Sequence, residues 1–410
     1  MTNSRGNSPL PTIVGCLIVQ LCVGILYLWS VFRADIVETF SWTDKAAAMV
    51  ASYMLLSFVA GNLIGGFIND KKGPKLTVIV GVVLFSCGIG LTGLLSSSSV
   101  GFLYLTYCVI GGLGSGFGYI ACISCIQKWL PHRRGVASGL AVSAFGLSTV
   151  VFAPLSKWLI EQFRDGTSGI VDFRSVFFVL AGIFLVVGLI ATCFVRLPGE
   201  EYLNSLPVTG NSRNAATLRD YSLTEAARTA RFWYLFLFIF FINGTWNLAV
   251  PLIKGLGLER GLAESLAVFA VSFTGISNSA GRLLMASLSD KIGRVSASMI
   301  LVGITFAGAI LMTVVWGVPY IVVVAAIAFG YGGPAAINAA ICTDFFGPKN
   351  AGTNYGVITL SLGLSAVTFN WISGHILGGS VIPTFLMAAL TAVIAGICML
   401  AINRYLKRSI

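Results

Sequence analysis

Twelve apolar runs, each long enough to span a bilayer, constrain the fold of this chain more than any other feature. An α-helix needs about 20 apolar residues to cross a hydrocarbon layer about 30 Å thick. The runs lie at residues 11–32, 45–68, 76–95, 101–127, 135–160, 175–195, 232–253, 262–288, 295–316, 320–341, 352–376 and 381–402. A polar stretch separates the first six from the last six. We therefore expect an all-α membrane protein with six-helix bundles at 1–195 and 232–410, joined by a cytoplasmic linker at 196–231.

The composition excludes a soluble or disordered chain, since 56% of the residues are hydrophobic, 10% are charged and the mean hydropathy is +0.90. Placing both termini and the even-numbered connections in the cytoplasm collects 18 of the 26 Lys+Arg on that side. This distribution follows the positive-inside rule. We expect a multi-pass protein of the plasma (inner) membrane, embedded in the lipid bilayer. The net charge of +11 then reflects topology and indicates no nucleic-acid partner.

The two halves are copies of one another. Seven residues of the first half, Ser57, Ala60, Gly61, Leu63, Asp70, Lys71 and Gly73, recur 220 positions later as Ser277, Ala280, Gly281, Leu283, Asp290, Lys291 and Gly293. The expected bundles are therefore pseudo-symmetric. Within this repeat, Asn62 of the first copy corresponds to Arg282 of the second, so this arginine belongs to the second half alone.

Arg282 lies eight residues before Asp290, which at about 1.5 Å per residue is about 12 Å into the hydrocarbon layer. An arginine stays charged at that depth and is costly there, so we expect it to face a wet cavity or a bound anion. Asn278 lies one turn away on the same face. No Asp or Glu lies deep in any run, so a carboxylate substrate is the predicted counter-ion. The alternative is a structural arginine bonded to backbone carbonyls.

The polar turns at residues 66–75 and 289–294 carry a D-K-x-G pattern twice, at equivalent places. An acid at a helix mouth can pair with the end of a neighbouring helix and hold a gate shut. We therefore assign gating roles to Asp70, Lys71, Asp290 and Lys291, the alternative being charges that only set topology. This double signature resembles that of the major facilitator superfamily, which implies two six-helix bundles moving by alternating access.

The segment W-L-P-H-R-R-G-V-A-S-G at residues 129–139, together with Arg282, is similar to the monocarboxylate transporter family, with its bacterial lactate-transporting members, and to the related oxalate/formate antiporters. The resemblance implies proton-coupled symport of lactate, pyruvate or a similar small monocarboxylate. Oxalate/formate antiporters carry a second cation eight residues after N-Y-G, where this chain has Leu362. A single cation suits a substrate with one carboxylate.

Aromatic and polar residues elsewhere are further candidates for the substrate site. The resemblance implies that Tyr119 and Tyr331 line a central cavity. We also expect Tyr27, Leu28 and Trp29 to contact the substrate's tail and Asn247 to bond its hydroxyl or keto oxygen. For each of these six residues, ordinary interior packing is the alternative.

Two departures from the family affect the predicted coupling. Proton-linked members have an aspartate where this chain has Asn278, and a lysine in the first helix, which is absent here. An anion exchanger is therefore the alternative to a proton symporter, and a transporter-like sensor is a third possibility. We expect no cofactor, no metal and no catalysis, because His132 and His375 are solitary and Cys122 and Cys125 lie within an apolar run. We also expect a functional monomer.

Overall fold

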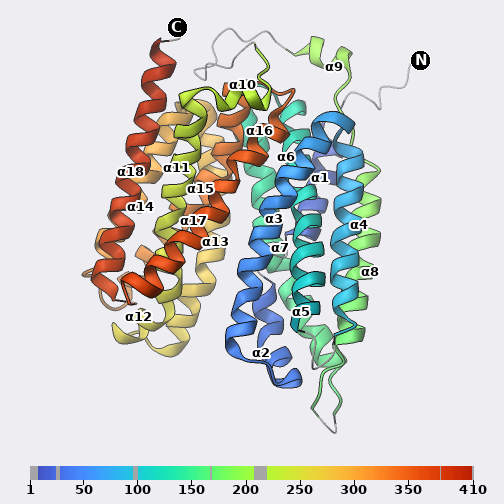
Figure 1. Ribbon diagram of the computed structural model, residues 1–410, viewed down its shortest axis with the longest axis vertical. Helices are drawn as coiled ribbons and strands as arrows, with labels where there is room; N and C mark the ends of the chain where they lie inside the picture. Colours follow the sequence, from blue (N-terminus) through green and yellow to red (C-terminus); the bar gives the residue numbers. More distant parts are fainter. Residues whose placement is uncertain are drawn as a thin grey trace. The chain divides into compact units, whose positions relative to one another are not determined.

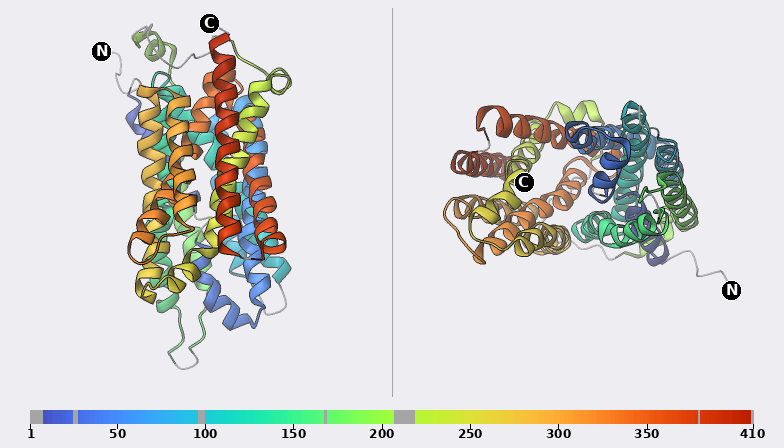
Figure 2. Two further views of the ribbon diagram at one scale, coloured as in Figure 1. Left: turned by 90° about the vertical axis from the view of Figure 1, so that its left-hand side faces the viewer. Right: turned by 90° about the horizontal axis from the view of Figure 1, so that it is seen from below.

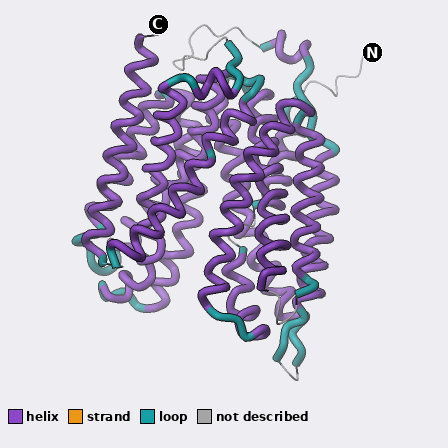
Figure 3. Tube along the Cα trace, in the orientation of Figure 1, coloured by secondary structure: helices purple, strands orange, loops and turns teal. Residues whose placement is uncertain are grey.

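The computed structural model describes residues 8–24, 28–95, 100–166, 169–206, 219–378 and 380–408. Every named element in these ranges is a helix, and Figure 3 draws the described chain as helices joined by short loops. The chain forms two compact units. The first contains Met1–Trp129 and Ala144–Val208, and the second contains Leu130–Ser143 and Thr209–Ile410. Helix α7 (Arg134–Gln162) thus contributes its first turns to the second unit, whereas the sequence alone assigns it to the first bundle.

The first unit is built from long helices that pack lengthwise, coloured blue to green in Figure 1. Its closest packing joins α3 to α6 and α4 to both α6 and α8. The elements are α1 (Leu10–Val23), α2 (Trp29–Phe40), α3 (Asp44–Lys72), α4 (Pro74–Thr92), α5 (Val100–Leu103), the π-helix η3 (Tyr104–Gly111), α6 (Gly112–Trp129), the remainder of α7, α8 (Phe173–Thr192) and α9 (Glu200–Ser205).

The second unit has the same construction, and Figure 2 shows its yellow-to-red helices running alongside one another. Its main packing pairs are α13 with α15 and α11 with α18. The elements are the start of α7, α10 (Leu223–Ala227), α11 (Ala230–Ala249), the 3₁₀ turn η4 (Val250–Leu252), α12 (Ile253–Glu259), α13 (Glu264–Ile292), α14 (Arg294–Leu311), α15 (Pro319–Phe346), α16 (Ala351–Ile358), α17 (Leu360–Trp371), the π-helix η5 (Ile372–Ile376) and α18 (Val381–Arg408).

Ten helical segments of the described chain are long and apolar enough to cross a membrane. The two predicted runs outside this set differ for physical reasons. The run at 11–32 is interrupted, because α1 ends at Val23 and α2 begins at Trp29. The run at 262–288 forms the continuous 29-residue helix α13, but its serines, Asn278 and Arg282 lower its hydropathy.

The sequence repeat is confirmed in the structure. Helices α3 and α13 are both 29 residues long, and each of their ends is displaced by the same 220 positions that separate the repeated motifs. Each ends at a glycine with positive φ, 86° at Gly73 and 94° at Gly293. Residues that carry a side chain rarely adopt this backbone conformation, whereas glycine adopts it readily. The glycine of D-K-x-G is thus needed to turn the chain into the following helix, α4 or α14.

Ser222 and Glu225 form a capping box shortly before α11. The Ser222 hydroxyl accepts from the Glu225 backbone N–H, and the Glu225 carboxylate accepts from the Ser222 backbone N–H. The two bonds satisfy free N–H groups at the start of a helix. They begin the short helix α10, which precedes α11.

Glycines bring α13 and α15 unusually close together. A methyl group added to Gly281 of α13 would meet the backbone oxygen of Phe329, and one added to Gly332 of α15 would meet that of Asn278. Small residues permit this approach of two helix backbones. The packing therefore fixes the position of the α13 segment that carries Asn278 and Arg282.

Candidate functional site

Arg282 lies inside the second unit with only 5% of its surface exposed. Its Nη1 donates a hydrogen bond to the backbone carbonyl of Val142 in α7, at 2.9 Å, while its buried Nε has no partner in the described part of the chain. Among the described residues, no carboxylate forms an ion pair with it. The carbonyl contact anticipated as an alternative is therefore present, and it leaves part of the guanidinium group unsatisfied.

Small residues on α7 allow α13 to come close to it. Gly139 lies against the backbone of Arg282, because a methyl group added to this glycine would be 3.1 Å from the Arg282 backbone oxygen. The Ser143 hydroxyl donates to the Ser279 carbonyl at 3.2 Å. Gly135, one turn earlier on α7, has no room for a side chain beside Ala286. The G-V-A-S-G segment thus has a direct role, since it brings the Val142 carbonyl within reach of Arg282.

Asn278 lies one turn before Arg282, as its spacing predicts. Its Oδ1 is buried and has no hydrogen-bond partner among the described residues. It faces Gly332 of α15 so closely that a methyl group added to this glycine would lie 2.8 Å from it. An unsatisfied buried polar atom costs about 1–3 kcal/mol. Two such atoms on one face of α13, Asn278 Oδ1 and Arg282 Nε, indicate a place suited to a polar ligand or water.

Tyr331 and Asn247 lie near a pocket of the second unit. The Tyr331 ring stacks on Trp246 of α11, with centroids 5.0 Å apart and an interplanar angle of 14°. Asn247 donates from Nδ2 to the Ser365 hydroxyl of α17 at 3.2 Å. The pocket has a volume of about 340 Å³. It is lined by Trp246, Asn247, Val250, Pro251, Asn370, Ser373 and Gly374. Asn370 and Ser373 were not predicted, because no sequence motif marks them.

The predicted residues of the first unit are mostly committed to packing. Leu28 is fully buried. Trp29 donates from Nε1 to the Ala47 carbonyl at 2.9 Å and packs on Tyr107. Tyr119 of α6 meets two phenylalanines edge-on, with ring centroids 5.1 and 5.0 Å away. Tyr27 lies outside the described residues.

The Asp290 carboxylate accepts hydrogen bonds from free backbone N–H groups at the start of helix α7. Its two carboxylate oxygens bond the backbone N–H of Gly135 at 2.9 Å and of Val136 at 2.8 Å. A negative charge at this position stabilises a helix N-terminus electrostatically. The predicted pairing of this acid with a helix end is therefore present, within the second unit.

A buried ion network extends from Asp290. Arg294 bonds Asp290 through Nη1 at 2.6 Å and Asp344 of α15 through Nε at 2.9 Å. Arg134, at the start of α7, reaches the other oxygen of Asp344 at 2.9 Å. Asp344 is 4% exposed and was not predicted as a site residue. The sequence did mark Asp344 in one way, because this acid lies about one turn after the apolar run at 320–341.

The equivalent turn of the first unit is organised differently. The Asp70 carboxylate accepts from Asn69 Nδ2 at 3.2 Å, and the exposed Lys71 ammonium lies 4.1 Å from the centre of the Phe67 ring. The position equivalent to Arg294 is Pro74. Lys291 is exposed, as a charge near the membrane surface would be.

Asn62, the counterpart of Arg282, is fully buried on α3, and within the described ranges neither its Nδ2 nor its Oδ1 has a hydrogen-bond partner. Both copies of the repeat thus place a polar group with unsatisfied atoms at the same position. In the part of the chain that the structure describes, no group of three or more His, Cys, Asp or Glu side chains is arranged to hold a metal ion.

Several known proteins are similar to this chain in sequence. YhjX of Escherichia coli (strain K12), described as an uncharacterized MFS-type transporter, is 28% identical over 365 residues, 87% of this chain and 85% of that protein. The oxalate:formate antiporter of Oxalobacter formigenes is 26% identical over 360 residues, 87% and 81% of the two chains. Monocarboxylate transporter 2 of Mus musculus is 31% identical over 243 residues, 56% of this chain and 48% of that protein.

The fold is similar to that of solved transporters. The crystal structure of the transporter FucP in its outward conformation matches with a TM-score of 0.74 at 14% identity, over 96% of this chain and 98% of that one. At that identity the match shows the fold alone. The family model of the Major Facilitator Superfamily matches residues 13–369. With its repeat, its helices and these similarities, the chain belongs to the Major Facilitator Superfamily.

Proposed function

We propose that the protein is a secondary transporter of small monocarboxylates such as lactate or pyruvate. Arg282 carries this proposal, because it is a buried arginine in a membrane-spanning helix, bonded to one backbone carbonyl and lacking a carboxylate partner among the described residues. Its unsatisfied Nε is suited to an anionic oxygen. The named activities of two relatives, an oxalate:formate antiporter and a monocarboxylate transporter, support a carboxylate as the anion.

The energy of such a contact suits a carrier. A carboxylate about 4 Å from a guanidinium group gains about 4 kcal/mol at an effective dielectric of about 20, before the cost of desolvation. This is enough to select an anion and still release it. Arginine also presents two N–H groups in a plane that matches the two oxygens of a carboxylate.

Other residues would recognise the rest of the substrate. We propose that Asn278 and Asn247 hydrogen-bond a hydroxyl or keto oxygen, and that Tyr331, stacked on Trp246, forms an aromatic wall. From the first bundle we propose Tyr119 as a second aromatic contact. We also propose that Tyr27, Leu28 and Trp29 contact the substrate's tail; Leu28 and Trp29 are buried in the structure.

We further propose that Asp290 and Lys291, with Asp70 and Lys71, form the cytoplasmic gate. The bonds from Asp290 to the start of α7 support this role, because releasing them frees a helix end. The carrier would alternate between two states as six-helix bundles at 1–195 and 232–410, joined by the linker at 196–231, rock around the bound substrate. We place it in the plasma membrane with both termini in the cytoplasm, working as a monomer.

For coupling, we propose symport with protons and retain anion exchange as the second candidate. The observation that favours exchange is Asn278, an amide in place of an acid that can carry a proton. An empty site would then hold an unpaired positive charge and reorient slowly, whereas a loaded site would be neutral. Exchange is also the activity after which the Oxalobacter formigenes relative, an oxalate:formate antiporter, is named.

Proteoliposomes distinguish the two. A symporter accumulates labelled lactate when an inward proton gradient is imposed on vesicles that contain no substrate. An exchanger responds weakly to that gradient and takes up label rapidly when the vesicles are preloaded with unlabelled lactate. Binding of lactate with no flux under either condition would contradict both candidates and favour a sensor.

A further inference from the structure

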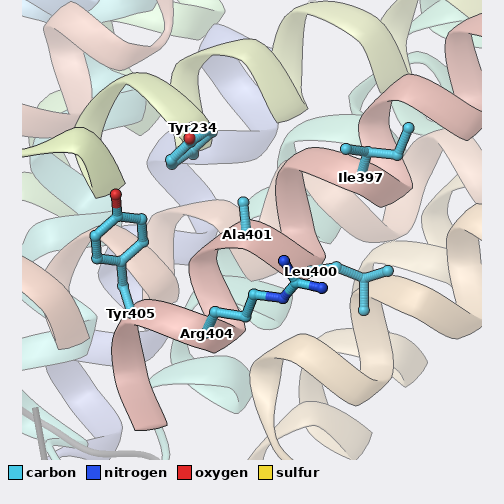
Figure 4. Close-up of a pocket in the computed structure, with 6 residues that line it drawn as sticks. All are labelled: Tyr234, Ile397, Leu400, Ala401, Arg404 and Tyr405. Carbon is cyan, nitrogen blue, oxygen red and sulfur yellow. The ribbon is translucent and has the colours of Figure 1, made fainter. Parts of the chain in front are cut away.

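A pocket of about 440 Å³ lies between α11 and α18 and contains none of the residues proposed to bind substrate. Figure 4 shows its lining, with Tyr234 supplied by α11 and the other side chains by α18. The lining residues are Tyr234, Ile397, Leu400, Ala401, Arg404 and Tyr405. The pocket is therefore apolar toward the middle of α18 and polar toward its C-terminal end.

The charge of this pocket is positive and uncompensated. Arg404 forms no ion pair with any residue that the structure describes. Neither α11 nor α18 contains an Asp or Glu, while the last turn of α18 adds Lys407 and Arg408 to the sequence. In Figure 4, Arg404 extends along α18 toward Leu400. This exposed guanidinium group, which pairs with no carboxylate of the described residues, is thus available to an anion.

The other lining residues suit a lipid. Ile397 is 60% exposed and Leu400 is 48% exposed, so the part of the pocket toward the middle of α18 offers uncovered apolar surface. Tyr234 and Tyr405, which also line the pocket, have ring centroids 6.0 Å apart. Tyrosines of this kind are typical of the level at which lipid headgroups meet acyl chains.

We propose that this pocket binds an anionic phospholipid of the cytoplasmic leaflet. Its phosphate would pair with Arg404, the tyrosine hydroxyls would bond the headgroup, and an acyl chain would cover Leu400 and Ile397. Basic pockets between helices at the cytoplasmic side of a membrane, where we propose that the C-terminal end of α18 lies, are known to bind such headgroups. A free phosphate would satisfy Arg404 alone, whereas a phospholipid also covers the apolar surface, so the pocket favours the lipid.

The test uses the full chain, reconstituted in bilayers of phosphatidylethanolamine and phosphatidylglycerol and then released into detergent for native mass spectrometry. We expect wild-type protein to retain phosphatidylglycerol and Arg404→Gln to retain about fivefold less, as for loss of one basic contact near a membrane surface. The control is Arg228→Gln, an exposed arginine outside the pocket, which should retain as much as wild type. Arg404→Lys should retain an intermediate amount.

Equal retention by wild type and Arg404→Gln would overturn the proposal, as would displacement of the bound lipid by millimolar inorganic phosphate, which would identify a simple anion site. An equal loss in Arg228→Gln would also overturn it, since binding would then depend on overall charge. Because retention is measured without flux, the outcome is independent of whether the protein carries lactate.

Discussion

Arg282 and Val142 are joined by a hydrogen bond of 2.9 Å, from the guanidinium Nη1 of one to the backbone carbonyl of the other. A charged side chain in the middle of α13 is thus held by a neutral dipole, and its Nε has no partner among the residues that the structure describes. A carboxylate is a stronger acceptor for a guanidinium group than a carbonyl, because it carries a full negative charge and can accept two parallel N–H bonds. A substrate anion can therefore compete for this arginine.

Substitution of Asn247 by Leu tests the contact to the substrate's hydroxyl. We expect the KM for L-lactate to rise about five- to tenfold, since one net hydrogen bond contributes about 1 kcal/mol, while the KM for propionate, which lacks the hydroxyl, stays unchanged. Competition uptake assays with the two acids measure both values. Asn370→Leu alters the same pocket and serves as the control. If that variant alone loses the preference for lactate, Asn370 has the role assigned to Asn247.

Replacing Gly332 by Ala tests whether close packing positions Asn278. The added methyl group meets the Asn278 backbone oxygen, so α13 and α15 must separate. We expect a loss of stability of about 1–3 kcal/mol and a clear fall in lactate uptake. Gly275→Ala, on α13 but with open space around it, is the matched control and should behave as wild type. Equal effects of the two variants would show that helix content, rather than this contact, is being measured.

Asp290→Asn tests the ion network at the start of α7. The variant keeps the shape of the side chain but removes the charge that pairs with Arg294 and the α7 N–H groups. Breaking one side of a buried pair costs about 3–5 kcal/mol. We expect a lower denaturation temperature in detergent and slower counterflow.

Lys291→Gln changes the neighbouring exposed charge and should shift stability by no more than about 0.5 kcal/mol. If it slows counterflow as much as Asp290→Asn does, the proposed gate depends on surface charge and not on the bonds of Asp290.

Glu225 gives a pH dependence to α10. The backbone N–H of Ser222, then its hydroxyl, then Arg219 lower the pKa of this carboxyl from 4.5 to about 2. Because the folded pKa is depressed, the stabilisation is complete above about pH 4.5 and is lost as the pH falls through about 2. Hydrogen exchange of the 219–231 peptide should therefore stay slow down to pH 3.

Glu225→Gln should make the same peptide exchange faster at neutral pH, because the capping box loses its charged acceptor. Glu201→Gln, in the exposed helix α9, is the control and should leave it unchanged. Unaltered exchange in Glu225→Gln would mean that packing alone holds α10.

Local patterns predicted much of this architecture, while contacts between distant residues escaped them. Apolar length gave the helices, and the D-K-x-G repeat gave the matched ends of α3 and α13, because both depend on neighbouring residues. The bonds of Asp344 join residues 50 and 210 positions away, and no local spacing indicates such partners. The break between α1 and α2 was also missed, since hydropathy continues through it.

Among the candidate site residues, the sequence located Arg282 and Asn278 on one helical face, and the structure adds their unsatisfied atoms. The sequence did not reveal that Trp29 donates a hydrogen bond to Ala47 or that Tyr119 packs between two phenylalanines. An aromatic residue in an apolar run suits a packed interior and a cavity wall equally well.

Uptake of labelled L-lactate into proteoliposomes by wild-type protein and by Arg282→Gln shows directly whether Arg282 binds the substrate. Uptake is measured with an imposed inward proton gradient and, separately, with preloaded vesicles. We expect saturable uptake by wild type under at least one condition and a loss of about ten- to a hundredfold in Arg282→Gln under both, since a hydrogen bond to a charged group contributes about 1.5–3 kcal/mol. Normal uptake by a folded Arg282→Gln variant would contradict the central claim that this arginine binds the carboxylate.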